Sequence, residues 1–117
     1  MLLLDLPDPP SAVFAFNDNM AIGTLRAARA RGLSVPADFS VVGFDDSELA
    51  TATTPALTTV RQPLAEMGRM AVTLLLRLLE NRRDERLSIE LQTRLIVRDS
   101  TAAPRLSTNT ARGLPRG

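Results

Sequence analysis

The feature that most constrains the fold of this chain is an apolar run that stops at three consecutive Asn and Asp residues. The segment FAFNDNMAIG, residues 14–23, passes from apolar residues into NDN and then into small helix-forming residues. A short apolar run bounded by polar residues is typical of a strand buried inside a parallel sheet. Asn and Asp are favoured helix N-caps, but a cap needs only one such side chain. The segment therefore predicts a strand-to-helix turn that carries more polar side chains than one helix cap needs.

The alternation of strand and helix continues along the chain. Further strands are expected at FSVVGF (39–44) and LTTVRQ (57–62), after a first one at SAVFAF (11–16). Helices are expected at 19–32 and 64–83, and residues 87–100 are expected to form two strands joined by a kink. The second helix carries an apolar stripe made of Leu64, Met67, Ala71, Leu74, Leu75 and Leu78. This order predicts an α/β fold with a mostly parallel sheet flanked by helices.

The composition excludes several kinds of site. The chain has no Cys and no His, and all 14 of its basic residues are Arg. Disulfides, thiolate sites, His-based triads and lysine chemistry are therefore excluded. We expect no catalytic residues, no metal and no cofactor. The sequence also lacks an apolar run of membrane-spanning length. Its opening MLLLD is apolar for only a few residues and has no basic residue before it, so it does not fit a secretory signal, and we expect a cytoplasmic protein without a membrane partner.

The charge is distributed unevenly. Residues 100–117 hold three Arg and no acid, which leaves 11 basic and 13 acidic residues in the rest of the chain. A body with a net charge of −2 is not typical of a nucleic-acid-binding surface. The tail is rich in Pro, Gly, Ser and Thr, so it is expected to be disordered rather than to act as a DNA-binding arm.

Polar residues follow each of the three expected parallel strands. They are Asn17-Asp18, Asp45-Asp46 and Arg61-Gln62. Ligands of parallel α/β sheets bind at the carboxyl ends of the strands, where these residues would meet. An amide such as Asn17 can donate and accept hydrogen bonds, and an ionised Asp45 can accept from two neighbouring hydroxyls. The pattern favours a polyhydroxylated ligand, with Phe44 either offering it an apolar face or lying in the core.

Two alternatives remain for these polar groups. Asn17 and Asp18 could serve only as N-cap and first-turn residues of the helix. Asp45, Asp46 and Glu48 could instead hold Mg²⁺ for phosphoryl transfer. Such sites usually add a Lys from a later strand, and this chain has none. The magnesium hypothesis is therefore the less favoured of the two.

Four motifs occur in one order between residues 14 and 68. They read F-A-x-N-D-x-M-A-x-G, V-P-x-D-x-S-V-V-G-F-D-D, P-x-L-T-T-V-x-Q-P and M-G. In this combination the chain closely resembles the effector-binding region of LacI/GalR-type transcriptional regulators, over about residues 10–103. The resemblance implies part of a two-lobed, periplasmic-binding-protein-like type I fold. It also implies a small effector, often a sugar or related polyol, bound between the lobes.

The resemblance also implies roles for individual residues. Asn17 and Asp45 match positions that contact the effector, while Gln62 and Leu64 fall where the chain crosses between lobes beside the cleft. The helix from residue 20 to 31, with the segment 48–54, matches the dimer interface of the family. Its candidate contacts are Ile22, Leu25 and Leu49, and the alternative for such residues is a place in the core of the same chain.

By this resemblance the chain corresponds to the C-terminal part of a regulator. Residues 1–99 are expected to belong to the effector-binding domain and 100–117 to the tail. Within the domain, the C-terminal lobe would span 10–62, the crossover to the N-terminal lobe 63–92 and the return strand 93–99. Operator DNA would then be bound only through an N-terminal domain outside this sequence. A sugar-binding module of a transport system and a truncated, inactive remnant are the alternatives at this level.

Overall fold

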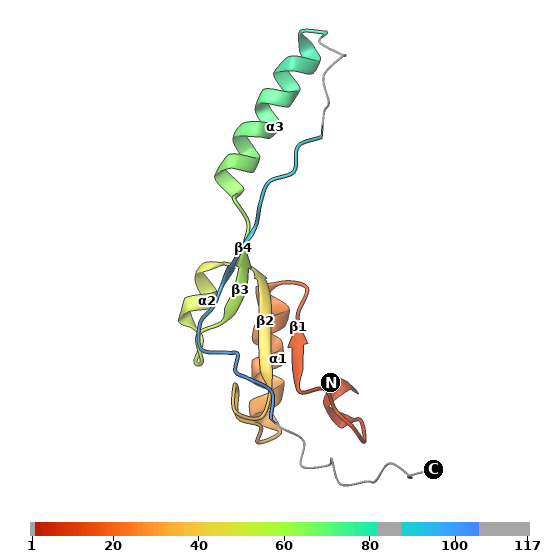
Figure 1. Ribbon diagram of the computed structural model, residues 1–117, viewed down its shortest axis with the longest axis vertical. Coiled ribbons are helices and arrows are strands. Elements are labelled where there is room, and N and C mark those ends of the chain that lie inside the picture. Colours follow the sequence, from red (N-terminus) through yellow and green to blue (C-terminus); the bar gives the residue numbers. More distant parts are fainter. Residues whose placement is uncertain (1, 82–87, 106–117) are drawn as a thin grey trace, which may run out of the picture.

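A four-stranded sheet in the order β1-β2-β3-β4 organises the chain (Figure 1). The computed structural model describes residues 2–81 and 88–105. The strands are β1 (Ala12–Phe14), β2 (Ser40–Asp45), β3 (Thr58–Arg61) and β4 (Arg94–Ile96). The helices are η1 (Leu2–Asp5), α1 (Asp18–Ala30), α2 (Glu48–Ala52) and α3 (Leu64–Leu79). β1, β2 and β3 are parallel and β4 pairs antiparallel with β3, which confirms the predicted α/β class with a mostly parallel sheet.

Two expectations about the strands are wrong. In residues 88–100 the structure forms one strand, β4, and not two joined by a kink. β1 is not a buried strand, because Phe14 is 67% exposed and Ala12 is exposed as well. The reason is position: β1 pairs only with β2 and forms the edge of the sheet in the described part of the chain.

The core lies between α1 and the middle of the sheet. Ala21, Leu25 and Ala28 recur on one face of α1 and are buried there, as their helical spacing predicts. The remaining core side chains come from the strands and their connections: Ala15, Phe39, Val41, Ala50 and Leu57. Figure 1 shows α1 lying along the sheet behind β2. The small alanine side chains allow this close approach.

α3 extends away from the sheet and from the other helices (Figure 1). None of its side chains is buried, and Leu64, Met67 and Leu75 of the expected apolar stripe are 62%, 41% and 59% exposed. The side of the helix that includes Met67 and Leu74 borders a hollow of about 280 Å³ against Ile89 and Leu91. None of the helices in the described part of the chain has the length and apolar content needed to span a bilayer.

The ordered chain continues beyond residue 99. Ser100 is fully buried, its hydroxyl donates to the Val41 carbonyl at 2.6 Å, and it accepts from the Thr58 amide at 2.8 Å. Arg105 still donates from Nε to the Ala37 carbonyl at 3.1 Å. The expected start of a disordered tail at residue 100 is therefore wrong, because residues 100–105 pack against the sheet and its loops. Residues 106–117 of that expected tail lie outside the described residues.

The side chain of Asp18 joins three parts of the fold. It is 1% exposed at the first residue of α1. Its Oδ2 accepts from the Ser47 amide at 2.7 Å, and its Oδ1 accepts from the Thr59 hydroxyl at 2.5 Å. A Cβ on Gly43 would lie 2.4 Å from Asp18 Oδ1, so only glycine leaves room for the carboxylate over β2. Asp18 thus fixes α1 to the turn after β2 and to β3.

A second carboxylate joins the ends of the strands. Asp46 Oδ1 accepts from Arg98 at 2.7 Å, and Oδ2 accepts from Arg61 Nε at 2.5 Å. Burial by itself would raise the pKa of Asp46, but the hydrogen bonds and charges of Arg98 and Arg61 outweigh it and hold that pKa below 3.8. The turn after β2 is thereby connected to β3 and to the chain that follows β4.

We expect Asp18→Ala to lower the free energy of unfolding by about 2–4 kcal/mol, because the Ser47 amide and the Thr59 hydroxyl both lose their buried acceptor. Urea unfolding followed by circular dichroism measures the change. Asn19→Ala is the matched control on the next, exposed residue. A loss no larger for Asp18→Ala than for this control would contradict the structural role of Asp18.

The Asp46 cluster makes a prediction about pH. The unfolded chain takes up a proton at Asp46 near pH 3.8, whereas the folded chain takes it up only at lower pH. The stabilisation is therefore complete well above pH 3.8 and is lost as the pH falls through the lower pKa of the folded state. Urea unfolding between pH 6 and pH 2.5, compared with Asp46→Asn, measures it. The variant should show a shallower loss at low pH, and equal slopes for the two proteins would refute the prediction.

Candidate ligand-binding site

An open cavity of about 660 Å³ lies at the carboxyl ends of β1 and β2. Its lining residues are Phe14, Ala15, Phe16, Asn17, Phe44, Asp45 and Gln62. Asn17, Asp45 and Gln62 were predicted from the sequence as ligand-binding residues at strand ends, and the structure brings all three to this one cavity. The parallel pairing of β1, β2 and β3 explains why, since it aligns the three carboxyl ends at one edge of the sheet.

Asp45 and Gln62 form the polar side of the cavity. Gln62 Nε2 donates to Asp45 Oδ1 at 2.9 Å, which orients both side chains. Within the described part of the chain the Asp45 side chain makes no other hydrogen bond, so its Oδ2 can still accept one. The Gln62 amide keeps a carbonyl oxygen and a second N–H for a ligand. Together the two residues offer both acceptors and a donor a short distance apart.

Asn17 has two functions in the structure. As the N-cap of α1, its Oδ1 accepts from the Met20 amide at 2.9 Å. Its Nδ2 stays available as a donor beside the cavity. The neighbouring Asp18 points the other way, into the core. The surplus of polar groups in NDN is thus explained by one cap that also lines the cavity and one buried carboxylate.

An unusual backbone conformation at the end of β2 gives the side chains of Asp45 and Asp46 different surroundings. Their φ angles are 122° and 55°, in the left-handed region that residues other than glycine rarely adopt. Strained residues of this kind cluster at ligand sites, where the surrounding structure holds them in place. Here Asp45 lines the cavity, while both oxygens of Asp46 are bound by Arg61 and Arg98.

This arrangement opposes the magnesium hypothesis. A carboxylate already neutralised by two guanidinium groups is a poor ligand for Mg²⁺. In the part of the chain that the structure describes, no group of three His, Cys, Asp or Glu residues could hold a metal ion. The oxygen chemistry at the end of β2 therefore suits hydrogen-bond donors better than a cation.

Three of the four phenylalanines of the chain form the apolar side of the cavity. Phe14 and Phe16 are 67% and 83% exposed, and Phe44 is partly buried. The sequence pattern suggested Phe44 as an apolar face for the ligand, but it predicted Phe14 and Phe16 inside a buried strand. Their spacing of two residues, directly before the polar cluster, would put both on one face of an extended segment and was the available signal, although β1 itself ends at Phe14. Aromatic walls with a few placed polar groups are typical of small-molecule sites.

The other predicted contacts lie away from this cavity. Leu64 is the first residue of α3, 62% exposed, and does not line it. The predicted dimer contacts Ile22, Leu25 and Leu49 border hollows between α1 and α2. Leu25 is also part of the core, with 9% of its surface exposed, while Leu49 is 50% exposed. The ligand contact of Leu64 and the dimer contacts of Ile22, Leu25 and Leu49 stay predictions.

Comparison with known proteins places this chain in a family. Residues 2–101 match the family model described as periplasmic binding protein-like domain. The repressor CytR of Escherichia coli strain K12 is 46% identical over 101 residues, which cover 86% of this chain and 30% of that protein. The repressor PurR of Proteus mirabilis is 45% identical over 100 residues, covering 86% of this chain and 29% of that one.

Solved structures agree with the sequence relatives. The transcriptional regulator CelR in complex with cellobiose is 43% identical, with a TM-score of 0.77 over 83% of this chain and 30% of its own. The Lac repressor dimer bound to operator and the anti-inducer ONPF is 38% identical, with a TM-score of 0.75 over 80% and 32% of the two chains. The chain thus spans about 30% of the curated relatives' length. It belongs to the periplasmic binding protein-like domain family and matches the effector-binding region of LacI-type transcriptional regulators.

Proposed function

We propose that this chain is the effector-binding and dimerisation part of a LacI-type transcriptional regulator, with a sugar or related polyol as effector. The observation that carries the proposal is the convergence of Asn17, Asp45 and Gln62 on one cavity with three phenylalanines. In this hypothesis the protein acts by binding, with no catalytic residue and no cofactor, and it works in the cytoplasm. The relatives named as transcriptional repressors support that class.

The chemistry of the cavity fits a polyhydroxylated molecule. Asp45 Oδ2 can accept from a hydroxyl, while the Asn17 and Gln62 amides can donate to ring or hydroxyl oxygens. The exposed faces of Phe14 and Phe16 suit the apolar C–H face of a sugar ring. Two structural relatives support this class: one is a complex with cellobiose, and a LacI family regulator of Enterococcus faecium contains bound ribose.

The position of the cavity suggests how binding is transmitted. Gln62 lines the cavity and is followed at once by Pro63 and α3, so a ligand held by Gln62 contacts the connection between the sheet and that helix. A ligand that binds one orientation of this connection better than another shifts the balance between them. In the complete regulator the shift would change how a dimer presents its DNA-binding domains, which lie outside these 117 residues.

The expected dimer contacts are part of the same proposal. Ile22, Leu25 and Leu49 would lie in an interface between two copies through α1 and α2. Two similar solved structures are of Lac repressor dimers, which supports dimerisation as part of this proposal. A sugar-binding module of a transport system and a truncated, inactive remnant are the alternatives, and the relatives reported above as transcriptional regulators argue against the first.

We expect ribose or cellobiose, used as probes, to bind this chain, and Asp45→Ala to weaken that binding roughly 10- to 100-fold, because a hydrogen bond to a charged acceptor is lost. Isothermal titration calorimetry or ligand-observed NMR measures the dissociation constant.

Asp8→Ala is the control for this experiment, because it removes an exposed carboxylate that does not line the cavity. It should leave the dissociation constant unchanged. Equal affinities for the Asp45→Ala protein and the unaltered chain would show that Asp45 does not hold the ligand. If the unaltered chain bound neither probe at millimolar concentration, these two sugars would be excluded as effectors that it can bind by itself.

A further inference from the structure

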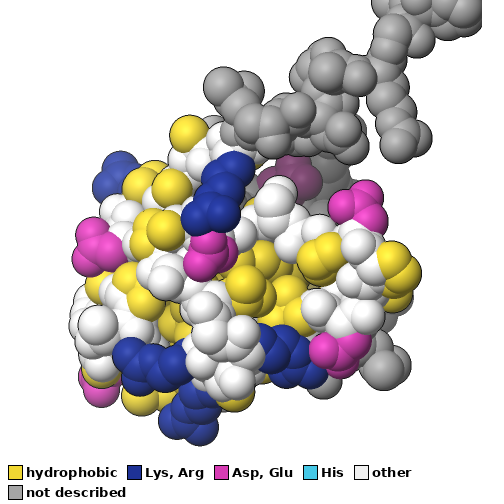
Figure 2. All heavy atoms as spheres, turned by 90° about the horizontal axis from the view of Figure 1, so that it is seen from below, with side chains coloured by type: hydrophobic (Ala, Val, Ile, Leu, Met, Phe, Trp, Pro, Cys, Tyr) yellow, Lys and Arg dark blue, Asp and Glu magenta, His cyan; other side chains and the backbone are white. Residues whose placement is uncertain are grey.

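Arg98 is an arginine that lies largely inside the fold. Figure 2 shows the end of the molecule opposite α3, where arginine side chains lie on the surface. The side chain of Arg98, in contrast, is only 16% exposed. Its Nη1 donates to the Leu57 carbonyl at 2.9 Å and its Nη2 to Asp46 Oδ1 at 2.7 Å, while its backbone amide donates to the Thr58 hydroxyl oxygen at 2.9 Å. Arg98 is thus held at three points.

Arg98 is the stronger of the two cationic partners of Asp46. The side chain of the other partner, Arg61, is 52% exposed, and water weakens a charge pair at such a position. The pair with Arg98 is largely covered, and the same guanidinium group is oriented by the Leu57 carbonyl. Without Arg98, Asp46 would keep one partner that is half in water.

Asp46 in turn constrains Asp45, the residue before it. Both have positive φ angles, 122° for Asp45 and 55° for Asp46, and such conformations persist only where the surrounding structure holds them. The backbone of Asp46 gives little support, because its amide lies 3.4 Å from the Thr59 hydroxyl oxygen, at the long limit of a hydrogen bond. The bonds of the Asp46 side chain are therefore the nearest strong support for Asp45.

The orientation of Asp45 decides what the cavity offers to a ligand. Asp45 Oδ1 accepts from Gln62 Nε2 at 2.9 Å, and both residues line the cavity. A rotation of the Asp45 backbone would move its carboxylate and break this bond, so the acceptor and the donor would no longer lie side by side. Arg98 does not line the cavity, so any effect of Arg98 on a ligand is indirect.

We propose that Arg98 is a positioning residue of the effector cavity, which holds Asp46 and thereby keeps Asp45 and Gln62 in the orientation that receives the ligand. The proposal rests on the effector binding put forward above and adds a residue outside the cavity. Because Arg98 follows β4, it also connects the chain after β4 to the cavity. By linkage, a ligand that favours this orientation of Asp45 strengthens the hold of Arg98 on the sheet.

The first test uses the full chain without ligand and the variants Arg98→Gln and Arg98→Lys. Gln removes the charge, whereas Lys keeps it but lacks the planar fork that binds Leu57 and Asp46 together. In ¹⁵N NMR spectra we expect the Gln62 side-chain amide and the Asp45 backbone amide to shift in Arg98→Gln, and to shift less in Arg98→Lys. If Arg98→Gln does not fold, the Lys variant carries the test. Unchanged Gln62 and Asp45 signals in the folded variants would overturn the proposal.

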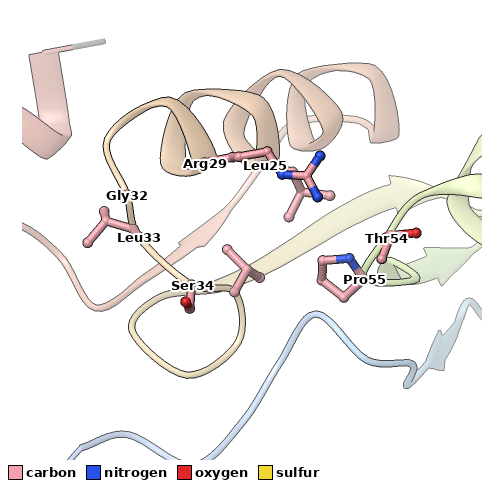
Figure 3. Close-up of a pocket in the computed structure, with 8 residues that line it drawn as sticks. Leu25, Arg29, Gly32, Leu33, Ser34, Thr54 and Pro55 are labelled. Atoms are coloured by element: carbon pink, nitrogen blue, oxygen red, sulfur yellow. The ribbon is translucent and has the colours of Figure 1, made fainter.

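Arg29→Gln is the matched control for both NMR variants. Arg29 is an exposed arginine in the last turn of α1, where it reaches over a separate hollow towards Thr54 and Pro55 (Figure 3). This variant loses the same charge and should leave the Gln62 and Asp45 signals in place. Equal shifts in the control and in Arg98→Gln would count against a specific role of Arg98.

A double-mutant cycle then separates positioning from general destabilisation. With ribose or cellobiose as the probe, Arg98→Gln should raise the dissociation constant about 10-fold, whereas adding it to Asp45→Ala should raise it less than about 2-fold, because Arg98 acts through Asp45. Isothermal titration calorimetry measures both. A merely structural role would weaken binding equally in the two backgrounds, and that result would overturn the proposal. If neither sugar bound the unaltered chain while the Gln62 and Asp45 signals still shifted in Arg98→Gln, these sugars would fail as effectors and the positioning by Arg98 would stand.

Discussion

The buried carboxylate of Asp18 is the interaction on which the rest of this structure depends. It lies at the first residue of α1, where the helix N-terminus favours a negative charge, and it binds both the Ser47 amide and the Thr59 hydroxyl. Glycine at position 43 leaves the space that this carboxylate fills over β2. One side chain thereby sets the distances between α1, the turn after β2 and β3.

These fixed distances determine the cavity. Asn17 precedes Asp18 directly and is held by its own bond to the Met20 amide. Asp45 also lines the cavity and is next to Asp46, which two guanidinium groups hold in place. The polar side chains that line the cavity therefore come from strand ends and a helix cap whose neighbours are bonded into the fold. Such support keeps a binding site ready before the ligand arrives.

Sequence reasoning succeeded where the signal is local. The alternation of apolar runs with capped helices predicts the α/β class, and the rule for parallel strand ends places Asn17, Asp45 and Gln62 at one cavity, while their contact with a ligand stays a prediction. It failed where the outcome depends on distant partners. Phe14 is exposed because β1 lies at a sheet edge, and Ser100 is ordered because Val41 and Thr58 bond to it. No local pattern distinguishes the buried Asp18 from a second ligand-facing residue, since its partners lie 29 and 41 positions along the chain.

The central claim is that the cavity at the strand ends is the effector site and that the buried Asp18 holds the elements around it in place. The most direct measurement is an NMR titration of the ¹⁵N-labelled chain with ribose and with cellobiose. The account predicts shifts of the Gln62 side-chain amide and of the backbone amides of Asn17 and Asp45. The Ser47 amide, bonded to Asp18, should move much less. Shifts confined to the hollows between α1 and α2, around Ile22 and Arg26, with none at the cavity, would contradict it.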